Sequence, residues 1–168
     1  VWNNSKGHFF SRSLEVDIDL GDHVRPYLAI LSLFYLLAPT PYVLLGFQSL
    51  VLAMTAWPLY RLALRKFNSP SAGLAIVFCA LAYPPLGFLN RADFHAEVIA
   101  VPLLVAAYER LDAEDLKTAA IFMSLALLGK ESIGLSVAAL GLFTAIYQKH
   151  WLFGLIWTTL GSGYSLVA

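Results

Sequence analysis

The chain has 168 residues, of which 59% are hydrophobic and only 13% are charged. A typical soluble domain carries about 25% charged residues, and a globular protein of this length cannot hide so much apolar surface from water. The 11 basic and 11 acidic residues cancel, and the single cysteine excludes an internal disulfide. The composition therefore indicates a membrane protein whose partner is the lipid bilayer, and no basic patch points to a nucleic acid.

Long uncharged stretches separate the charged residues. Neither Tyr42–Tyr60 nor Phe67–Asn90 contains a charged side chain, and apolar runs of about 18 or more residues are typical of transmembrane helices. We therefore predict an all-α fold, a polytopic transmembrane helical bundle that forms a single domain over residues 1–168, with about six membrane segments after residue 41. The segments are expected at 41–60, 70–89, 98–108, 118–129, 132–147 and from 152 onward.

Basic residues set the predicted orientation. Arg61, Arg65 and Lys66 follow the first segment, and Lys149 follows a later one. Lysine and arginine beside the ends of spans mark the cytoplasmic side, so residues 90–97 are expected outside and the turn "ERLDAEDLK" inside. The chain is thus predicted to be an integral, multi-pass protein, and its expected location is a prokaryotic cell membrane.

The part before the first span has a different character. Residues 1–26 are polar and are predicted to form an extracytoplasmic loop, whereas residues 27–38 are apolar and are followed by Pro39 and Pro41. As a helix, residues 27–38 would be roughly 18 Å long, which is too short for a hydrocarbon core of about 30 Å. They are expected to form an interfacial or re-entrant helix on the outer side, with Pro26 at its first turn.

Three groups of polar residues fall on the predicted outer side. Asp22 and His23 belong to the first loop, "NRADFHAE" follows the second span, and Lys130 with Glu131 follows "ALLG". The last two residues are expected roughly 20 Å into the bilayer by helical rise, and an ionised group at the bilayer centre costs about 2.5–3.5 kcal/mol. Because neighbours on a helix diverge by about 100°, at least one of the two is expected to contact another segment.

The same residues can also be explained by ordinary structural roles, without a functional site. Asp93 can cap the N-terminus of a helix that has Glu97 in its first turn, and Arg91 can anchor the segment at the interface or hold a phosphate. On a helix, Asp93 and Glu97 share one face while His95 points elsewhere, so these three alone make a weak metal site. The pair in the first loop can be ordinary loop polarity.

Taken together, the three groups suit a substrate with a buried lipid tail and an anionic head. A lysine or arginine can neutralise a phosphate, and a carboxylate can act as a general base or hold a divalent cation such as Mg²⁺ or Mn²⁺. Sugar transfer from a polyprenyl-phosphate donor is a reaction of this kind. The candidate residues are Asp22, Glu97 and Glu131 for catalysis, His23, Arg91, His95 and Lys130 for substrate binding, and Asp22 and Asp93 for a metal.

The ordered elements "GDH" at Gly21–His23, "FHAE" at Phe94–Glu97 and "KE" at Lys130–Glu131 carry a resemblance over nearly all of the chain. The sequence resembles a family of predicted polytopic membrane proteins, domain of unknown function 2079, in the clan of GT-C type glycosyltransferases. The family usually has aspartate where this chain has Ser132. The resemblance implies a lipid-phosphate sugar donor, an external active site, a catalytic acid in the first external loop and a further transmembrane helix upstream of Val1.

The sequence therefore predicts a membrane glycosyltransferase that takes a sugar from a polyprenyl-phosphate donor on the extracytoplasmic face. A secondary transporter is the alternative from another class, with Lys130 and Glu131 as an intramembrane coupling site. That alternative predicts internal repeats, and the sequence shows none. A third possibility is a non-catalytic subunit of a membrane assembly, in which Lys130 and Glu97 would be dispensable.

Overall fold

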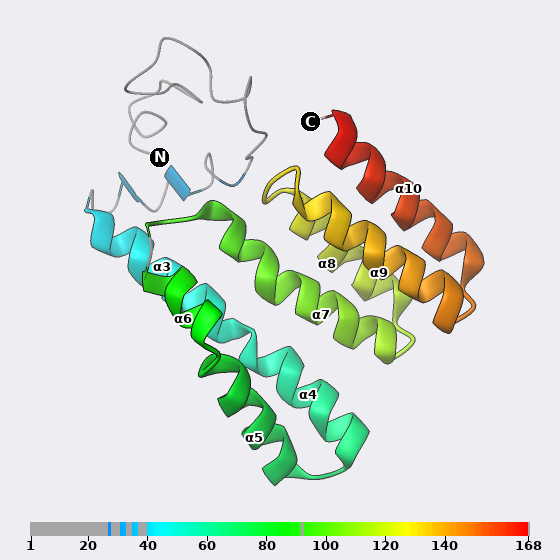
Figure 1. Ribbon diagram of the computed structural model, residues 1–168, viewed down its shortest axis with the longest axis horizontal. Coiled ribbons are helices and arrows are strands. Elements are labelled where there is room, and N and C mark those ends of the chain that lie inside the picture. The colour runs from blue at the N-terminus through cyan, green and yellow to red at the C-terminus, as the bar shows by residue number, and fades with distance from the viewer. Residues whose placement is uncertain (1–26, 28–30, 33–34, 37–39, 92, 168) are drawn as a thin grey trace.

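The computed structural model describes residues 27, 31–32, 35–36, 40–91 and 93–167. These residues form helices joined by short turns, with no strand among them (Figure 1). The all-α prediction is therefore confirmed for this part of the chain. The described positions of the predicted interfacial segment are helical as well, namely Tyr27, Leu31, Ser32, Tyr35 and Leu36.

The helices follow the predicted segments closely. In chain order they are α3 (Pro41–Met54), α4 (Ala56–Phe67), α5 (Pro70–Leu81), α6 (Pro84–Arg91), the 3₁₀ helix η2 (Ala96–Ile99), α7 (Ala100–Asp112), α8 (Leu116–Leu127), α9 (Ile133–Tyr147) and α10 (Trp151–Val167). Two predicted spans are each divided in two. The first becomes α3 and α4, and the second becomes α5 and α6.

Proline explains both divisions. Pro58 has no N–H to donate to the carbonyl four residues earlier, so the helix is interrupted just before it, at Thr55, whose N–H donates to Leu52 O at 3.1 Å. The second interruption bends α5 against α6 by 49°, and Pro84 begins the new helix. The turn between α4 and α5 uses local sequence signals, with Asn68 in the left-handed conformation (φ 49°) before Pro70.

One helix among the described residues, Pro41–Phe67, is long and apolar enough to cross a membrane. The bent pair α5–α6 would be a second if it counts as one span, and α8 and α9 are shorter apolar helices. The predicted first span therefore has a counterpart of suitable length, and the second has one only if α5 and α6 count together. The remaining membrane segments stay a prediction.

The C-terminal helices α9 and α10 pack backbone against backbone. A Cβ atom added at Gly154 would lie 2.5 Å from the Cβ of Ala145, and one added at Gly141 would lie 2.6 Å from the N atom of Thr158. Small residues spaced along both helices allow this approach, which is the usual way for helices to associate in lipid. The buried core of α7–α10 includes Leu111, Met123 and Trp157.

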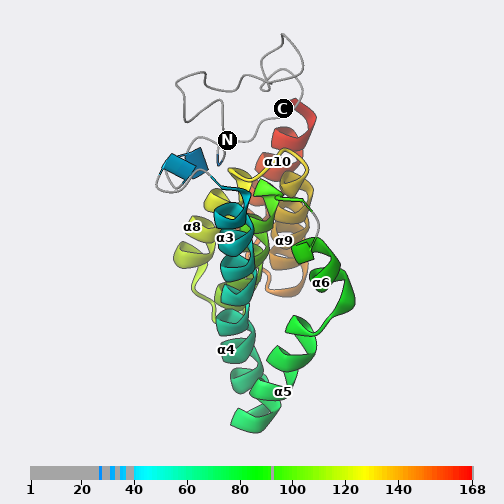
Figure 2. The same ribbon diagram turned by 90° about the vertical axis from the view of Figure 1, so that its left-hand side faces the viewer.

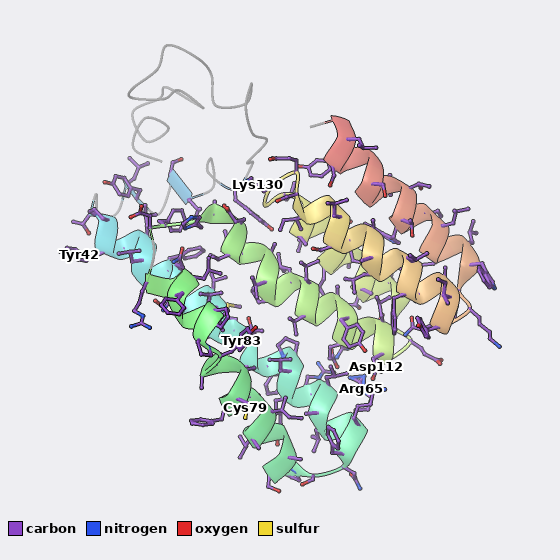
Figure 3. All side chains as sticks on the ribbon, viewed as in Figure 1. Tyr42, Arg65, Cys79, Tyr83, Asp112 and Lys130 are labelled. Carbon is purple, nitrogen blue, oxygen red and sulfur yellow. The ribbon has the colours of Figure 1, made fainter. Side chains whose placement is uncertain are left out.

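The two ends of the molecule carry different polar groups. The α8–α9 turn and η2 lie at one end, together with the C-terminal end of α10, whereas the α4–α5, α7–α8 and α9–α10 turns lie toward the other (Figures 1 and 2). We call the first the Lys130 end, after the labelled residue of the α8–α9 turn, and the second the Arg65 end (Figure 3). The predicted site residues that the structure describes are at the Lys130 end.

Candidate functional site

The segment between α6 and α7 presents Glu97 on the short helix η2. His95 is the residue that precedes η2, in an extended conformation (φ −121°, ψ 112°), and no side chain caps the helix. The prediction that Asp93 is the N-cap is therefore wrong. The chain stays extended through His95 because the His95 N–H donates to a side chain of α3 instead, so the helix starts later than expected.

That side chain of α3 is Gln48, which the sequence analysis missed. Gln48 is fully buried. Its Nε2 donates to Leu89 O at 3.1 Å, and its Oε1 accepts from the N–H of His95 at 2.9 Å. The one signal in the sequence was an amide residue inside the uncharged stretch Tyr42–Tyr60, beside Ser49. Gln48 thus ties the end of α6 and the start of η2 to α3.

Glu97 and Lys130 form an ion pair across the Lys130 end. The Lys130 Nζ lies 3.9 Å from the Glu97 Oε1, and the two side chains are 22% and 28% exposed. Both groups are partly shielded from water and remain reachable from outside. The structure therefore brings together two of the three predicted polar groups, the "NRADFHAE" segment and the Lys130–Glu131 turn.

Lys130 and Glu131 lie in the turn between α8 and α9 and point to different partners. Lys130 faces η2, whereas the Glu131 carbonyl oxygen accepts from the Ser165 Oγ of α10 at 2.6 Å. The Glu131 carboxylate also interacts electrostatically with Tyr164 of α10. The expectation that the two neighbours diverge is confirmed, and the divergence arises in a turn instead of along a helix.

The other predicted site residues near η2 lie apart from this ion pair. Arg91 is exposed at the end of α6, where its Nε donates to Gly87 O at 3.3 Å and its guanidinium lies 5.6 Å from the Phe88 ring centre. Asp93 is exposed, and its carbonyl oxygen accepts from the Nδ1–H of His95. The remaining predicted residues, Asp22 and His23, lie outside the described part of the chain.

A metal site is not assembled by the described residues alone. Among them, no three histidine, cysteine, aspartate or glutamate side chains come together as a divalent cation would need. Asp93 points out to solvent, and its predicted partner Asp22 lies outside the described residues.

Two described residues of the predicted interfacial segment, Tyr27 and Leu31, pack on η2. Leu31 and Tyr27 are buried against Ala96, with Phe47 and Phe94 around them. The Tyr27 hydroxyl donates to the Leu125 carbonyl near the end of α8. Burial raises the pKa of Tyr27 to about 12, so the hydroxyl stays protonated as a donor. Tyr27 and Leu31 therefore lie over the helix that carries Glu97.

An apolar groove begins next to η2. It has a volume of about 540 Å³ and lies between the α3–α4 helix and α7, with one residue of α8 at its side. Ile99, the last residue of η2, lines this groove and lies two positions after Glu97 in the sequence. The lining is Phe47, Val51, Met54, Trp57, Pro58, Ile99, Pro102, Leu103, Ala106 and Phe122, all of them apolar or aromatic.

The Arg65 end holds a cluster of ion pairs centred on Glu109 of α7. Its side chain is only 3% exposed and contacts three guanidinium groups, with Arg61 Nε at 3.5 Å, Arg110 Nη2 at 2.5 Å and Arg65 in direct contact. Asp112, one turn later, contacts Arg65 and Lys66 of α4. Figure 3 shows Arg65 and Asp112 side by side between α4 and α7.

The two segments that form this cluster are both predicted on the cytoplasmic side of the membrane. The sequence identifies "YRLALRKF" as a basic segment after the first span and "ERLDAEDLK" as a turn, but it does not show that their side chains pair. The pairing follows from the packing of α4 against α7. These charges hold two helices together, so we treat the cluster as structural and the Lys130 end as the candidate site.

The fold and the site together indicate the class of protein to which the chain belongs. The described residues are helical and include one helix long and apolar enough to cross a bilayer, together with many large exposed apolar side chains, as is usual in helical membrane proteins. The chain belongs to the family of predicted membrane proteins called domain of unknown function 2079, which matches residues 1–168. No curated protein and no solved structure matches it.

Proposed function

We propose that the protein is a multi-pass membrane glycosyltransferase of the GT-C kind that works at the outer face of a prokaryotic cell membrane. It would transfer a sugar from a polyprenyl-phosphate donor to an acceptor hydroxyl. The observation that carries this proposal is the Glu97–Lys130 pair beside a wholly apolar groove. An amphipathic donor needs both a charge for its phosphate and an apolar surface for its lipid chain.

Lys130 would bind the donor phosphate. Its Nζ lies 3.9 Å from Glu97, longer than the 2.7–2.9 Å or so of a charge-assisted hydrogen bond. The ammonium has three donors, so it can turn to a phosphate oxygen without breaking a tight contact. A partly shielded lysine is also a stronger electrostatic partner than one in bulk water.

Glu97 would act as general base toward the acceptor. In the transfer, the acceptor oxygen forms a bond to the anomeric carbon of the sugar, and the bond from that carbon to the phosphate oxygen breaks. The acceptor proton passes to the Glu97 carboxylate, and the polyprenyl phosphate leaves with the electron pair. Glu131 would orient Lys130 through the α8–α9 turn, while Asp22, His23, Arg91 and His95 stay candidates for binding the head group.

The groove would receive the first part of the lipid chain. From Phe47 to Trp57 it follows the helix axis for about 15 Å, roughly half of the hydrocarbon core. Its volume of about 540 Å³ lies in the range of roughly 300–1,000 Å³ that is usual for ligand sites. A lipid in this position would place its phosphate near η2 and its chain toward the bilayer centre.

The test is transfer from labelled polyprenyl-phosphate sugars in membranes that contain the full-length protein. Lys130→Gln and Glu97→Gln should each abolish most of the transfer, because one loses the phosphate contact and the other the base. Lys149→Gln is the matched control, since Lys149 is exposed in the α9–α10 turn. Absence of transfer across a broad donor panel, with folded protein present, would refute the proposal and favour a non-catalytic subunit.

A transporter is the second candidate, because two interrupted helices meet. The break at Thr55 and the bend at Tyr83 line one hollow of about 380 Å³, and the buried Thr55 hydroxyl has no hydrogen-bond partner within the described part of the chain. Discontinuous helices often form transport sites. Uptake by proteoliposomes that is driven by an ion gradient and reduced by Thr55→Val would support this reading over the transferase, and its loss in Lys130→Gln as well would place the coupling site at Lys130 and Glu131.

A further inference from the structure

Gln48 is a fully buried polar side chain at the Lys130 end, and both its amide N and O atoms have hydrogen-bond partners. It sits in an apolar helix, where an amide without partners would cost several kcal/mol. Its Nε2 donates to Leu89 O at 3.1 Å and approaches Asn90 O at 3.5 Å, and its Oε1 accepts from the N–H of His95 at 2.9 Å. The amide therefore joins three segments, α3, the end of α6 and the residue before η2.

We propose that Gln48 is the positioning residue that holds η2, and with it Glu97, opposite Lys130. The last carbonyls of a helix lack partners within the helix, and the Nε2 of Gln48 supplies one to α6. The Oε1 satisfies the N–H that directly precedes η2. These donors and acceptors allow only one orientation of the amide, so both ends of the segment between α6 and η2 are fixed from a single point.

The position of Glu97 follows from these bonds. η2 begins one residue after His95, has a single turn and has no side-chain cap of its own. Its first hydrogen bond runs from the Val98 N–H to the His95 carbonyl at 3.2 Å, so the turn that carries Glu97 closes on His95. Beyond Glu97, the buried Val98 and the start of α7 at Ala100 hold the chain in place. Loss of the Gln48 bond would let residues 93–95 shift and would open the turn that closes on His95 O, so the Glu97 carboxylate would no longer have a fixed position relative to Lys130, while Val98 and α7 stay packed.

The neighbouring Ser49 provides a matched control. Its hydroxyl lies 2.9 Å from Asn90 Oδ1, so it also contacts the end of α6, but it is exposed and its other contact is Leu45 O. Ser49→Ala therefore removes a polar contact to the same helix end without touching His95. The inference concerns the geometry of the site and holds whichever ligand the site takes.

The experiment measures a distance across the Lys130 end of the full chain. Spin labels are placed at two exposed positions, through Asp93→Cys in the segment before η2 and Ser132→Cys in the α8–α9 turn, with Cys79→Ala as background. We expect one narrow distance population in this background and with Ser49→Ala. Gln48→Leu should replace it with a broad or double population, because leucine keeps the volume and removes all the bonds.

Gln48→Glu keeps the test decisive if the leucine variant folds poorly. A buried carboxyl group tends to hold its proton, and in that form it can both accept from His95 and donate to Leu89. The narrow population should therefore return at about pH 5, where the protonated group replaces both bonds of the amide. A purely structural role would lower thermal stability and leave the distance unchanged in both variants, which would overturn the proposal. No donor lipid is involved, so this outcome is separate from the failure of the transferase proposal.

Discussion

The Arg65 end and the Lys130 end use their charges in different ways. At the Arg65 end, Glu109 is 3% exposed and contacts three arginines, and its neighbour Asp112 contacts two basic side chains. At the Lys130 end, one longer pair joins two partly exposed groups. Dense pairing commits charges to holding α4 against α7, whereas a single loose pair leaves its groups able to exchange partners. The difference indicates where a ligand can bind.

Apolar contacts, in place of ion pairs, hold the Lys130 end together. Leu31 is one of the most deeply buried side chains there and packs beside Tyr27 and Ala96. The hydrogen bonds of this end, from Tyr27 and Gln48, mostly reach backbone carbonyls and N–H groups. Such an end should depend little on salt, while the Arg65 end should weaken as salt screens its partly exposed arginines.

The largest expected effect is from Leu31→Ala. Removing a buried leucine costs about 2–5 kcal/mol in free energy of unfolding, through lost transfer energy and the cavity that remains. Unfolding in detergent micelles, followed by circular dichroism, would measure it. Leu36→Ala is the control in the same segment, because Leu36 is exposed. Equal effects of the two substitutions would contradict the packing of Leu31 on η2.

Glu109→Gln should come next, at about 2–3 kcal/mol. Breaking a fully buried pair costs about 3–5 kcal/mol, but Arg61 and Arg65 are partly exposed and water would screen part of that cost. The loss should shrink in high salt, unlike the loss from Leu31→Ala. The control is Glu114→Gln, since Glu114 is exposed in the α7–α8 turn that follows the helix of Glu109. A salt-independent loss would mean that the cluster is not held by charge.

The Glu97–Lys130 pair should contribute less than about 1 kcal/mol to stability, as partly exposed pairs usually do. A double-mutant cycle with Glu97→Gln and Lys130→Gln would measure the coupling energy between the two side chains. A small coupling together with loss of sugar transfer would sharpen the contrast between the ends. A coupling as large as the effect of Glu109→Gln would instead place this pair with the structural charges.

Most of the helix boundaries were predictable, because local signals set them. Pro41, Pro70 and the Asn68–Ser69 turn mark helix starts and ends in the sequence itself, and charged residues marked the α7–α8 turn. The division at Thr55 was missed, although Pro58 signalled it. A proline in an apolar run can kink a helix without ending it, so the run alone predicts one span.

The candidate site was predictable only in part. The predicted orientation in the membrane placed Glu97 and Lys130 on the same side, and the structure brings the two side chains together. Asp93 was misassigned because a capping pattern is local, whereas the N–H of His95 finds its partner 47 positions away in Gln48. The cluster around Glu109 was missed for a similar reason. Contacts between distant segments depend on how the helices pack, and no single stretch of sequence records that packing.

The smallest expected effect belongs to Asp115, at the Arg65 end. Its Oδ1 accepts from the N–H of Thr118 at 3.1 Å, and hydrogen bonds from the Thr118 hydroxyl and N–H, with the charge of Arg110, lower the pKa of the Asp115 carboxyl group below its ordinary value of 3.8. A lowered pKa means that the ionised form stabilises the fold. The contribution is therefore complete above about pH 4 and is lost as the pH falls through the folded-state pKa.

Asp115→Ala should thus lower the thermal midpoint slightly at pH 6, and the difference from the unsubstituted protein should narrow as the pH falls from 4 toward 3. Asp115→Ser is the control, because its hydroxyl can still accept from the N–H of Thr118 and does not titrate in this range. The advantage of serine over alanine should persist at both pH values. If the difference between aspartate and alanine stayed constant down to pH 3, the charge of this cap would contribute nothing, and the electrostatic stabilisation of the Arg65 end would be confined to the pairs of Glu109 and Asp112.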